Sequence, residues 1–249
     1  MSLFTGITFK TPVIRVKEKD LNLEFLQKNL GMKLVSEENA LAFLSGHASK
    51  EIRFTIEESP TYRTRAVEGT KKLNCIVIKA QASEIAQLLA RGAEARHLFK
   101  GEEGYAFETV SPQGDAILIH AENAIEDLEQ VTSVEVDLDP EFKGLSDFHV
   151  EEVVLNVPNS SASQAFYQDV FEGNLPFKLT FETAEGPDLT IEPQITWDIE
   201  FFEFQVSEEY DLVALYDYLV DKGLSPYIDK KARVVVVSDP SNIEIWFTK

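Results

Sequence analysis

Cysteine, histidine and long apolar runs are scarce in this sequence, and each shortage excludes a class of structure. The single cysteine, Cys75, excludes an internal disulfide and a thiolate-rich zinc site. No apolar stretch approaches the ~20 residues that a membrane-spanning helix needs. The first ten residues lack the basic and then apolar segments of a secretory signal. We therefore expect a cytoplasmic protein that reaches the cell surface only by a non-classical route.

Basic residues are also few, because 23 Lys and Arg face 43 Asp and Glu, for a net charge of −20. Such a charge argues against nucleic acid or an anionic membrane as a partner. The remaining composition, 44% hydrophobic and 27% charged, is that of a globular protein. The whole acidic excess lies in residues 125–249, since residues 1–124 hold 16 acidic and 16 basic side chains.

An acidic segment separates the two halves. Residues 121–141 hold eight acidic residues and no basic one; Pro140 lies near their end and Gly144 follows them. This pattern predicts a linker over residues 125–144, between domains at 1–124 and 145–249. A solvated helix and turn explain the segment better than a functional acidic tail does.

The two halves repeat each other. Residues 14–31 align with residues 155–172 at a constant offset of 141. Each copy predicts a strand, a polar turn and an amphipathic helix. The residues expected on the buried stripes are Leu23, Leu26 and Leu30 in the first helix and Ala162, Phe166 and Val170 in the second.

A second strand–helix unit also occurs twice. One begins at residues 74–78 and its helix ends at Gly92; the other begins at residues 200–206 and its helix ends at Gly223. Glycine can close a helix because it adopts positive φ freely. Each unit then ends in a predicted hairpin, so the chain has four similar modules of mixed strands and helices, which predicts an α+β fold.

The order of these pieces resembles the vicinal oxygen chelate superfamily of glyoxalase I and the extradiol dioxygenases. The matching segments are residues 13–16, 23–34, 111–115 and 239–242. The resemblance implies four βαβββ-type modules, paired into two glyoxalase/bleomycin-resistance/dioxygenase-like domains whose sheets form cups.

Within that superfamily the chain is similar to the streptococcal CppA-type proteins, which are named C3-degrading (complement-degrading) proteinases. The matching segments are residues 10–17, 34–40, 56–60, 63–69, 104–112 and 143–146. The resemblance implies cleavage or binding of complement C3. The proteinase label comes from this resemblance alone, so whether the chain is an enzyme stays open.

The superfamily resemblance also implies where metal ligands would lie in each cup. In the first half the family's histidine positions hold Thr11 and Leu73, and its glutamate position holds Leu118, so no metal is expected there. Arg15 would lie at the rim of this apolar cup. The cup is then either core, which we favour, or a site for a small acidic ligand.

In the second half the same positions hold Glu152 and Glu244, with Glu203 nearby and His149 on the strand of Glu152. Converging carboxylates repel unless a cation neutralises them or their pKa values rise. An oxygen-rich site suits Mn²⁺, Mg²⁺ or Ca²⁺, so Glu152 and Glu244 are candidate metal ligands. The alternative is an open cup with hydrated glutamates.

Recognisable protease motifs are missing from the sequence, which has neither His-Glu-x-x-His nor Gly-x-Ser-x-Gly. The best remaining pair is Cys75 with His120, which strand alternation places in the first cup. A buried cysteine that acts as a small apolar side chain is the usual case.

A basic loop at residues 63–72 contains Arg63, Arg65, Lys71 and Lys72. It could recognise an acidic partner or pair with the acidic second half of the chain, and both alternatives stay open.

Three functions are therefore consistent with the sequence. The first is cleavage or binding of complement C3. The second is a metal-dependent glyoxalase-like or dioxygenase-like enzyme, with Glu152, Glu203 and Glu244 in its site. The third is a non-catalytic protein that binds a small molecule in the C-terminal cup.

Overall fold

The computed structural model describes residues 3–249 and has an α+β fold, as the sequence predicts. Its strands form two sheets, of eight and seven strands. The chain divides into two compact units. Unit 1 comprises Met1–Arg15, Pro60–Lys72 and Leu155–Lys249, and unit 2 comprises Val16–Ser59 and Leu73–Val154. No helix within residues 3–249 is long and apolar enough to cross a membrane.

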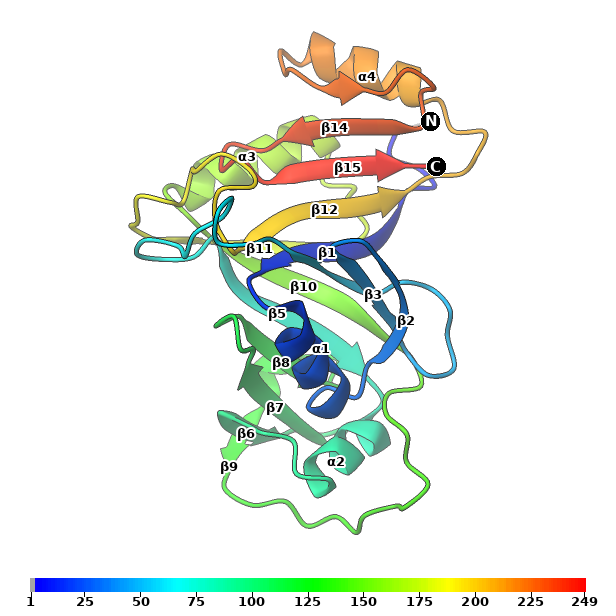
Figure 1. Cartoon of the computed structure of the whole chain (residues 1–249), viewed down its shortest axis with the longest axis vertical. Coiled ribbons are helices and arrows are strands. Elements are labelled where there is room, and N and C mark those ends of the chain that lie inside the picture. Colours follow the sequence, from blue (N-terminus) through cyan, green and yellow to red (C-terminus); the bar gives the residue numbers. More distant parts are fainter. Residues whose placement is uncertain (1–2) are drawn as a thin grey trace. The chain divides into compact units, whose positions relative to one another are not determined.

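Unit 1 is built on a run of five strands in the order β13-β14-β15-β12-β1, and Figure 1 shows β14, β15, β12 and β1 side by side. β12 is antiparallel to β1 and parallel to β15. The strands and helices of this unit are β1 (Thr8–Val16), β11 (Lys178–Thr183), β12 (Ile199–Gln205), β13 (Tyr227–Ile228), β14 (Val234–Ser238), β15 (Glu244–Thr248), α3 (Ser160–Phe171) and α4 (Leu212–Asp221). Strand β1 crosses into unit 2 at its last residue.

The core of unit 1 lies on one face of this sheet. Phe202 and Phe204 of β12 and Phe247 of β15 are fully buried, and Phe171 of α3 reaches Phe247 with ring centroids 6.3 Å apart. Leu215 of α4 is buried too. Because successive strand side chains alternate between faces, the residues between these aromatic rings point to the opposite face.

Helix α3 buries a different stripe from the predicted one. Val170 is buried as expected, but Ala162 is exposed and Phe166 is only half-buried, while Ser163 and Tyr167 face the core. Tyr167 can be buried because its hydroxyl donates a hydrogen bond to Asp239 Oδ2 at 3.1 Å. In the first half the predicted stripe is confirmed, since Leu23, Leu26 and Leu30 are all buried.

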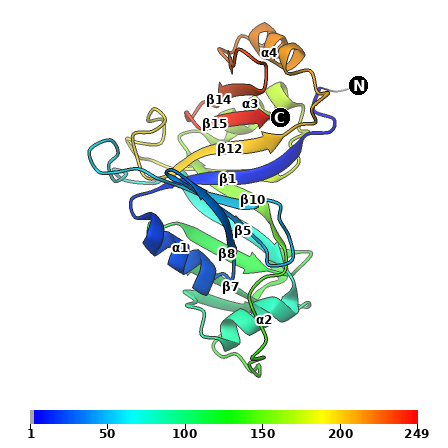
Figure 2. The same cartoon turned by 45° about the vertical axis from the view of Figure 1, so that its right-hand side comes forward.

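Unit 2 contains two groups of strands and two helices. One group has the order β4-β3-β2, and the other has the order β10-β5-β8-β7-β6-β9; Figure 2 shows β5, β8 and β7 side by side. The elements are α1 (Lys19–Lys28), β2 (Lys33–Glu38), β3 (Leu41–Ser45), β4 (Phe54–Glu58), β5 (Leu73–Ala80), α2 (Ala82–Ala90), β6 (His97–Lys100), β7 (Tyr105–Val110), β8 (Ala116–His120), the 3-10 helix η1 (Ile125–Asp127), β9 (Glu129–Val131) and β10 (Phe148–Val157), whose last three residues belong to unit 1.

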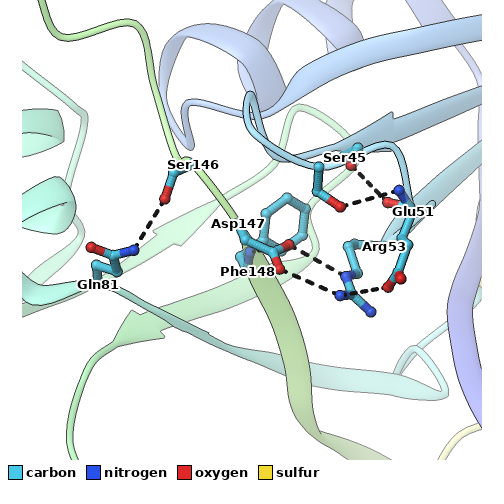
Figure 3. A network of polar contacts seen from close by, with 8 residues as sticks. Ser45, Glu51, Arg53, Gln81, Ser146, Asp147 and Phe148 are labelled. Carbon is cyan, nitrogen blue, oxygen red and sulfur yellow. Dashed lines mark hydrogen bonds and ion pairs between the residues drawn. The ribbon is translucent and has the colours of Figure 1, made fainter.

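Residues 145–147, which follow the acidic linker, are held in place by the loop between β3 and β4. The backbone N–H of His47 donates to Leu145 O at 2.7 Å, and that of Ala48 donates to Ser146 O at 2.8 Å. Figure 3 shows the side chains around this contact, where Arg53 reaches both carboxylate oxygens of Asp147 at 3.4 Å. Residues 145–147 are therefore fixed by backbone and side-chain bonds together.

Candidate functional site

The face of the unit 1 sheet opposite the core carries a cluster of charged and aromatic side chains, which we call the charged aromatic face. It comprises Lys10, Thr11, Arg15, Glu200, Phe201, Glu203, Glu244, Trp246 and Thr248, from β1, β12 and β15. The register places Glu203 opposite both Thr11 and Trp246, and Phe201 opposite Glu244. Residues that lie opposite each other in neighbouring strands share a face of the sheet, so these strands present one continuous surface.

Two irregularities in the pairing of β1 with β12 bring extra charges to this surface. The register shifts between Phe9 and Thr11, and again between Val13 and Ile14. These shifts leave Lys10 of β1 and Glu200 of β12 without an opposite residue, which is the pattern of a β-bulge. A bulge disturbs the strict alternation of side chains between the two faces of a sheet. Lys10 can therefore pair with Glu203, and Glu200 with Arg15, on the charged aromatic face.

Arg15 and Glu200 form a buried ion pair. Arg15 Nε donates to Glu200 Oε2 at 3.0 Å, and the two side chains are only 7% and 6% exposed. A buried charge is tolerated when an opposite charge neutralises it with a good hydrogen bond. This pair therefore fixes a guanidinium beside the neighbouring carboxylate, Glu244.

Glu244 lies half-buried at the start of β15. Its Oε2 accepts a hydrogen bond from Trp246 Nε1 at 2.8 Å. Burial raises the pKa of Glu244 above its ordinary value, and the nearby charge of Glu200 raises it further, whereas the Trp246 hydrogen bond and the charge of Arg15 lower it. A carboxyl group whose pKa is raised in this way is a candidate functional residue.

A stacked aromatic pair lies beside Glu244. The rings of Phe201 and Trp246 have centroids 4.7 Å apart and an interplanar angle of 21°. Both residues are half-buried, so each keeps part of its surface open to solvent. Such a pair offers a flat apolar platform next to the carboxyl group.

The negative charge of Glu203 is neutralised by a neighbouring lysine, Lys10. Its Oε1 accepts hydrogen bonds from Lys10 Nζ and from Thr248 Oγ1, both at 2.9 Å. The charged aromatic face thus contains two neutralised carboxylates, Glu200 and Glu203. Within residues 3–249, no lysine or arginine forms an ion pair with Glu244.

The other candidate residues lie in unit 2. Glu152 is buried, His149 is exposed and Cys75 is half-buried. His120 is fully buried, with its Nε2 3.0 Å from Glu151 Oε2. Its Nδ1 has no hydrogen-bond partner within the described residues.

Cys75 and His120 share a face but do not approach each other along the strands. The parallel register of β5 and β8 pairs Cys75 with Ala116 and pairs Lys79 with His120. Four residues of strand separate the two positions, which corresponds to about 13 Å. A thiol–imidazole contact needs hydrogen-bond distance, so this geometry does not assemble a catalytic pair.

The sequence-predicted carboxylates are therefore divided between the units. Glu203 and Glu244 lie together on the charged aromatic face, and Glu152 belongs to unit 2. Within residues 3–249 no group of three or more His, Cys, Asp and Glu side chains is arranged to hold a metal ion. On the charged aromatic face, the guanidinium of Arg15 already supplies positive charge, so these residues fit a divalent cation poorly. The cation at Glu152 and Glu244 stays a prediction.

Sequence reasoning missed four members of the face, namely Lys10, Glu200, Trp246 and Thr248. Strict alternation along β12 leaves out Glu200, and the bulge brings that residue to the same face as Glu203. Arg15 was expected at the rim of an apolar cup, but its partner Glu200 lies 185 residues further along the chain. A contact between residues so far apart in the chain leaves no local signal in the sequence.

The basic loop pairs with the acidic half of the chain. Arg65 forms two hydrogen bonds with the carboxylate of Asp188, and Lys72 Nζ donates to Ile191 O at 2.8 Å. The backbone N–H of Lys72 also donates to Asp198 Oδ2 at 2.6 Å. Burial lowers the pKa of Lys72, and the nearby charge of Asp239 opposes that shift. Of the two alternatives for the basic loop, pairing with the acidic half of the chain therefore applies to Arg65 and Lys72.

Comparisons with known proteins cover nearly the whole chain. A family model described as CppA N-terminal matches residues 9–131, and one described as CppA C-terminal matches residues 145–247. The structure is similar to the CppA protein of Streptococcus pneumoniae TIGR4, with 32% identity and a TM-score of 0.84, over 98% of this chain and all of the other. No curated protein matches the sequence.

More distant structures share the fold. A proposed dioxygenase from Bacillus subtilis has 10% identity and a TM-score of 0.66, over 96% of this chain and 84% of its own. A variant of glyoxalase I from Zea mays has 13% identity and a TM-score of 0.59, over 98% of this chain and 92% of its own. At these identities the similarity concerns the fold alone.

Proposed function

The chain belongs to the CppA family, and from this premise and the geometry of the charged aromatic face we propose that it binds a small organic molecule there. The observation that carries the proposal is the half-buried carboxyl of Glu244, next to the stacked rings of Phe201 and Trp246. Binding sites for small molecules combine apolar surface with a few fixed polar groups. The buried pair of Arg15 and Glu200 supports such a site because it holds its charges rigidly.

The experiment is a screen of small organic molecules by ¹H–¹⁵N NMR, followed through the indole N–H signals of the two tryptophans, Trp197 and Trp246. Ligands of this face should shift the Trp246 signal and lose affinity in Glu244→Gln and Trp246→Leu. The matched controls are Glu209→Gln, an exposed carboxylate of the same unit, and Trp197→Phe. A screen without ligands, or with ligands that bind both site variants unchanged, contradicts the proposal.

The complement alternative follows from the family resemblance, which implies cleavage or binding of C3. The separation of Cys75 from His120 along β5 and β8 weighs against a thiol proteinase built on those two residues. Incubating the purified protein with C3, beside Cys75→Ala and Glu152→Ala variants, tests this alternative directly. Cleavage that both variants retain would place proteolysis at other residues, and intact C3 in all samples would exclude the activity.

The metal-dependent alternative assigns a Mn²⁺, Mg²⁺ or Ca²⁺ ion to Glu152 and Glu244. When bound, such a cation polarises an oxygen of the substrate. The proximity of Arg15 to Glu244 weighs against it, because a doubly charged ion there exceeds the one negative charge that Glu200 and Glu244 leave unmatched by Arg15. Metal analysis of the native protein beside the Glu152→Ala/Glu244→Ala double variant decides the matter: stoichiometric metal in the native protein alone supports the ion.

A further inference from the structure

The charges on the charged aromatic face indicate which class of ligand it takes. Two of its three carboxylates already have cationic partners, since Arg15 holds Glu200 and Lys10 holds Glu203. Glu244 accepts a hydrogen bond from a neutral donor, the indole N–H of Trp246. Arg15 is paired with Glu200 and its charge also acts on Glu244, so one guanidinium faces two carboxylates. The three groups together carry one net negative charge, so one positive charge is the complement of this site.

The aromatic platform of Phe201 and Trp246 also favours a positively charged ligand. The faces of aromatic rings carry partial negative charge and attract cations, most strongly at tryptophan. Trp246 lies two residues after Glu244 on β15, and Phe201 stacks on it from β12. An ammonium group beside Glu244 would therefore contact a carboxylate and a ring that both favour it. A flat apolar group on the same molecule would cover the remaining ring surface.

We propose that the ligand of this face is a small organic cation, an ammonium group attached to a flat apolar body. The ammonium pairs with Glu244, and the apolar body lies on the rings of Phe201 and Trp246. This inference rests on the proposed function, that a small molecule binds here, and adds the chemical class of that molecule.

Other ligand classes fit the same residues less well. An anion would approach three carboxylates, two of which already occupy the cationic partners Arg15 and Lys10. A hydrated divalent cation requires six or more oxygen ligands with little tolerance for a nearby guanidinium. A neutral molecule could stack on the rings but would leave the net negative charge of Arg15, Glu200 and Glu244 unmatched. The ammonium class is the one that uses both the platform and the carboxylate.

The test uses three probes that share a phenyl ring and differ in their polar group: phenethylammonium, 2-phenylethanol and phenylacetate. Binding to the full chain is measured by tryptophan fluorescence and by calorimetry at neutral pH. We expect phenethylammonium to bind about tenfold more tightly than the alcohol, and phenylacetate to bind most weakly. Glu244→Gln should remove about tenfold of the ammonium affinity and change the affinity for the alcohol by about twofold or less.

Two further variants show whether a negative result contradicts the ammonium class alone or the binding site itself. Trp246→Leu should weaken all three probes, because it removes half of the platform, and Glu209→Gln should change none of them. Phenylacetate binding as tightly as phenethylammonium, or an ammonium preference that survives Glu244→Gln, overturns the inference. The proposed function stands in that case if Trp246→Leu still weakens binding. Absence of binding by all three probes overturns the ammonium class, while the screen described above continues to test the proposed function by itself.

Discussion

Arg65 holds Asp188 through two parallel hydrogen bonds, from Nη1 to Oδ2 at 2.6 Å and from Nη2 to Oδ1 at 2.8 Å. The backbone N–H of Glu68 donates to the same carboxylate at 2.7 Å. The backbone of Arg65 also bonds with Ile195 and Trp197, so both ends of the residue are tied to the loop before β12. These hydrogen bonds join residues 60–72 to residues 185–198 within unit 1.

Replacing Arg65 by lysine should destabilise unit 1. Lysine keeps the charge but cannot make two parallel hydrogen bonds, so Asp188, which is buried, loses one donor. Because the Arg65 side chain is 40% exposed, we expect a modest loss of about 1 kcal/mol in the free energy of unfolding. Urea denaturation measures it. Arg63→Lys is the matched control, since Arg63 contacts the ring of exposed Tyr62 instead of a carboxylate, and equal losses in both variants would contradict the prediction.

The same contact predicts a dependence of stability on acid. The hydrogen bonds from Arg65 lower the pKa of Asp188 below its ordinary value, and the Glu68 N–H adds to the effect. The unfolded chain therefore binds this proton at a higher pH than the folded chain does. The stabilisation is complete above the ordinary aspartate pKa and is lost as the pH falls through the folded value. Asp188→Asn should be less stable at neutral pH and should lose less stability on acidification; parallel acid curves for variant and parent would refute this.

The sequence predicted the elements of the fold better than it predicted their partners. Local sequence patterns located the strand at residues 200–206 and the helix that ends at Gly223. It could not show that β12 lies beside β1, since that pairing depends on contacts between residues far apart in the sequence. The repeat with offset 141 identified similar modules without indicating which strands of those modules meet.

The candidate site was also predicted only in part, because it too depends on contacts between residues far apart in the sequence. The superfamily resemblance placed Glu244 at a ligand position with Glu203 nearby, and both lie on the charged aromatic face. Strict alternation misses Glu200 because a bulge breaks the period of two, and Trp246 was missed because aromatic residues in strands usually belong to the core. Bulges and long-range ion pairs are consequences of tertiary packing and are invisible to a single local pattern.

His120 should make the protein sensitive to mild acid. Burial lowers the pKa of His120, and the charge of Lys79 lowers it further, whereas Glu151 opposes both. The unfolded chain takes up this proton near pH 6.5, and the folded chain does so only at lower pH. The unfolded state thus binds more protons in that interval, so the free energy of unfolding falls as the pH drops below about 6.5.

The variant His120→Gln should flatten this part of the stability curve, measured by urea denaturation at several pH values. Part of the slope should remain, because burial also lowers the pKa of His47. The exposed His149 provides the control, and His149→Gln should keep the full slope. An unchanged slope in His120→Gln would show that this imidazole titrates alike in both states.

Gly46 is required by the close packing of residues 145–147 and not by its backbone conformation. A Cβ atom at this position would lie 2.2 Å from Ser146 O and 2.6 Å from Asp147 Cα, and these are backbone atoms that cannot turn aside. Gly46→Ala should therefore cost roughly 1–3 kcal/mol by overpacking and should break the bonds from His47 and Ala48 to this segment.

Gly114→Ala is the matched control, because a Cβ there meets open space and the cost is only that of a positive φ, 86°, in a non-glycine residue, about 1 kcal/mol. Amide hydrogen exchange distinguishes the two effects. Exchange at His47 and Ala48 should accelerate in Gly46→Ala and stay slow in Gly114→Ala, because only the first substitution pushes the acceptors Leu145 and Ser146 away. Slow exchange at both amides in Gly46→Ala would mean that the segment relaxes around the added methyl group without losing these hydrogen bonds.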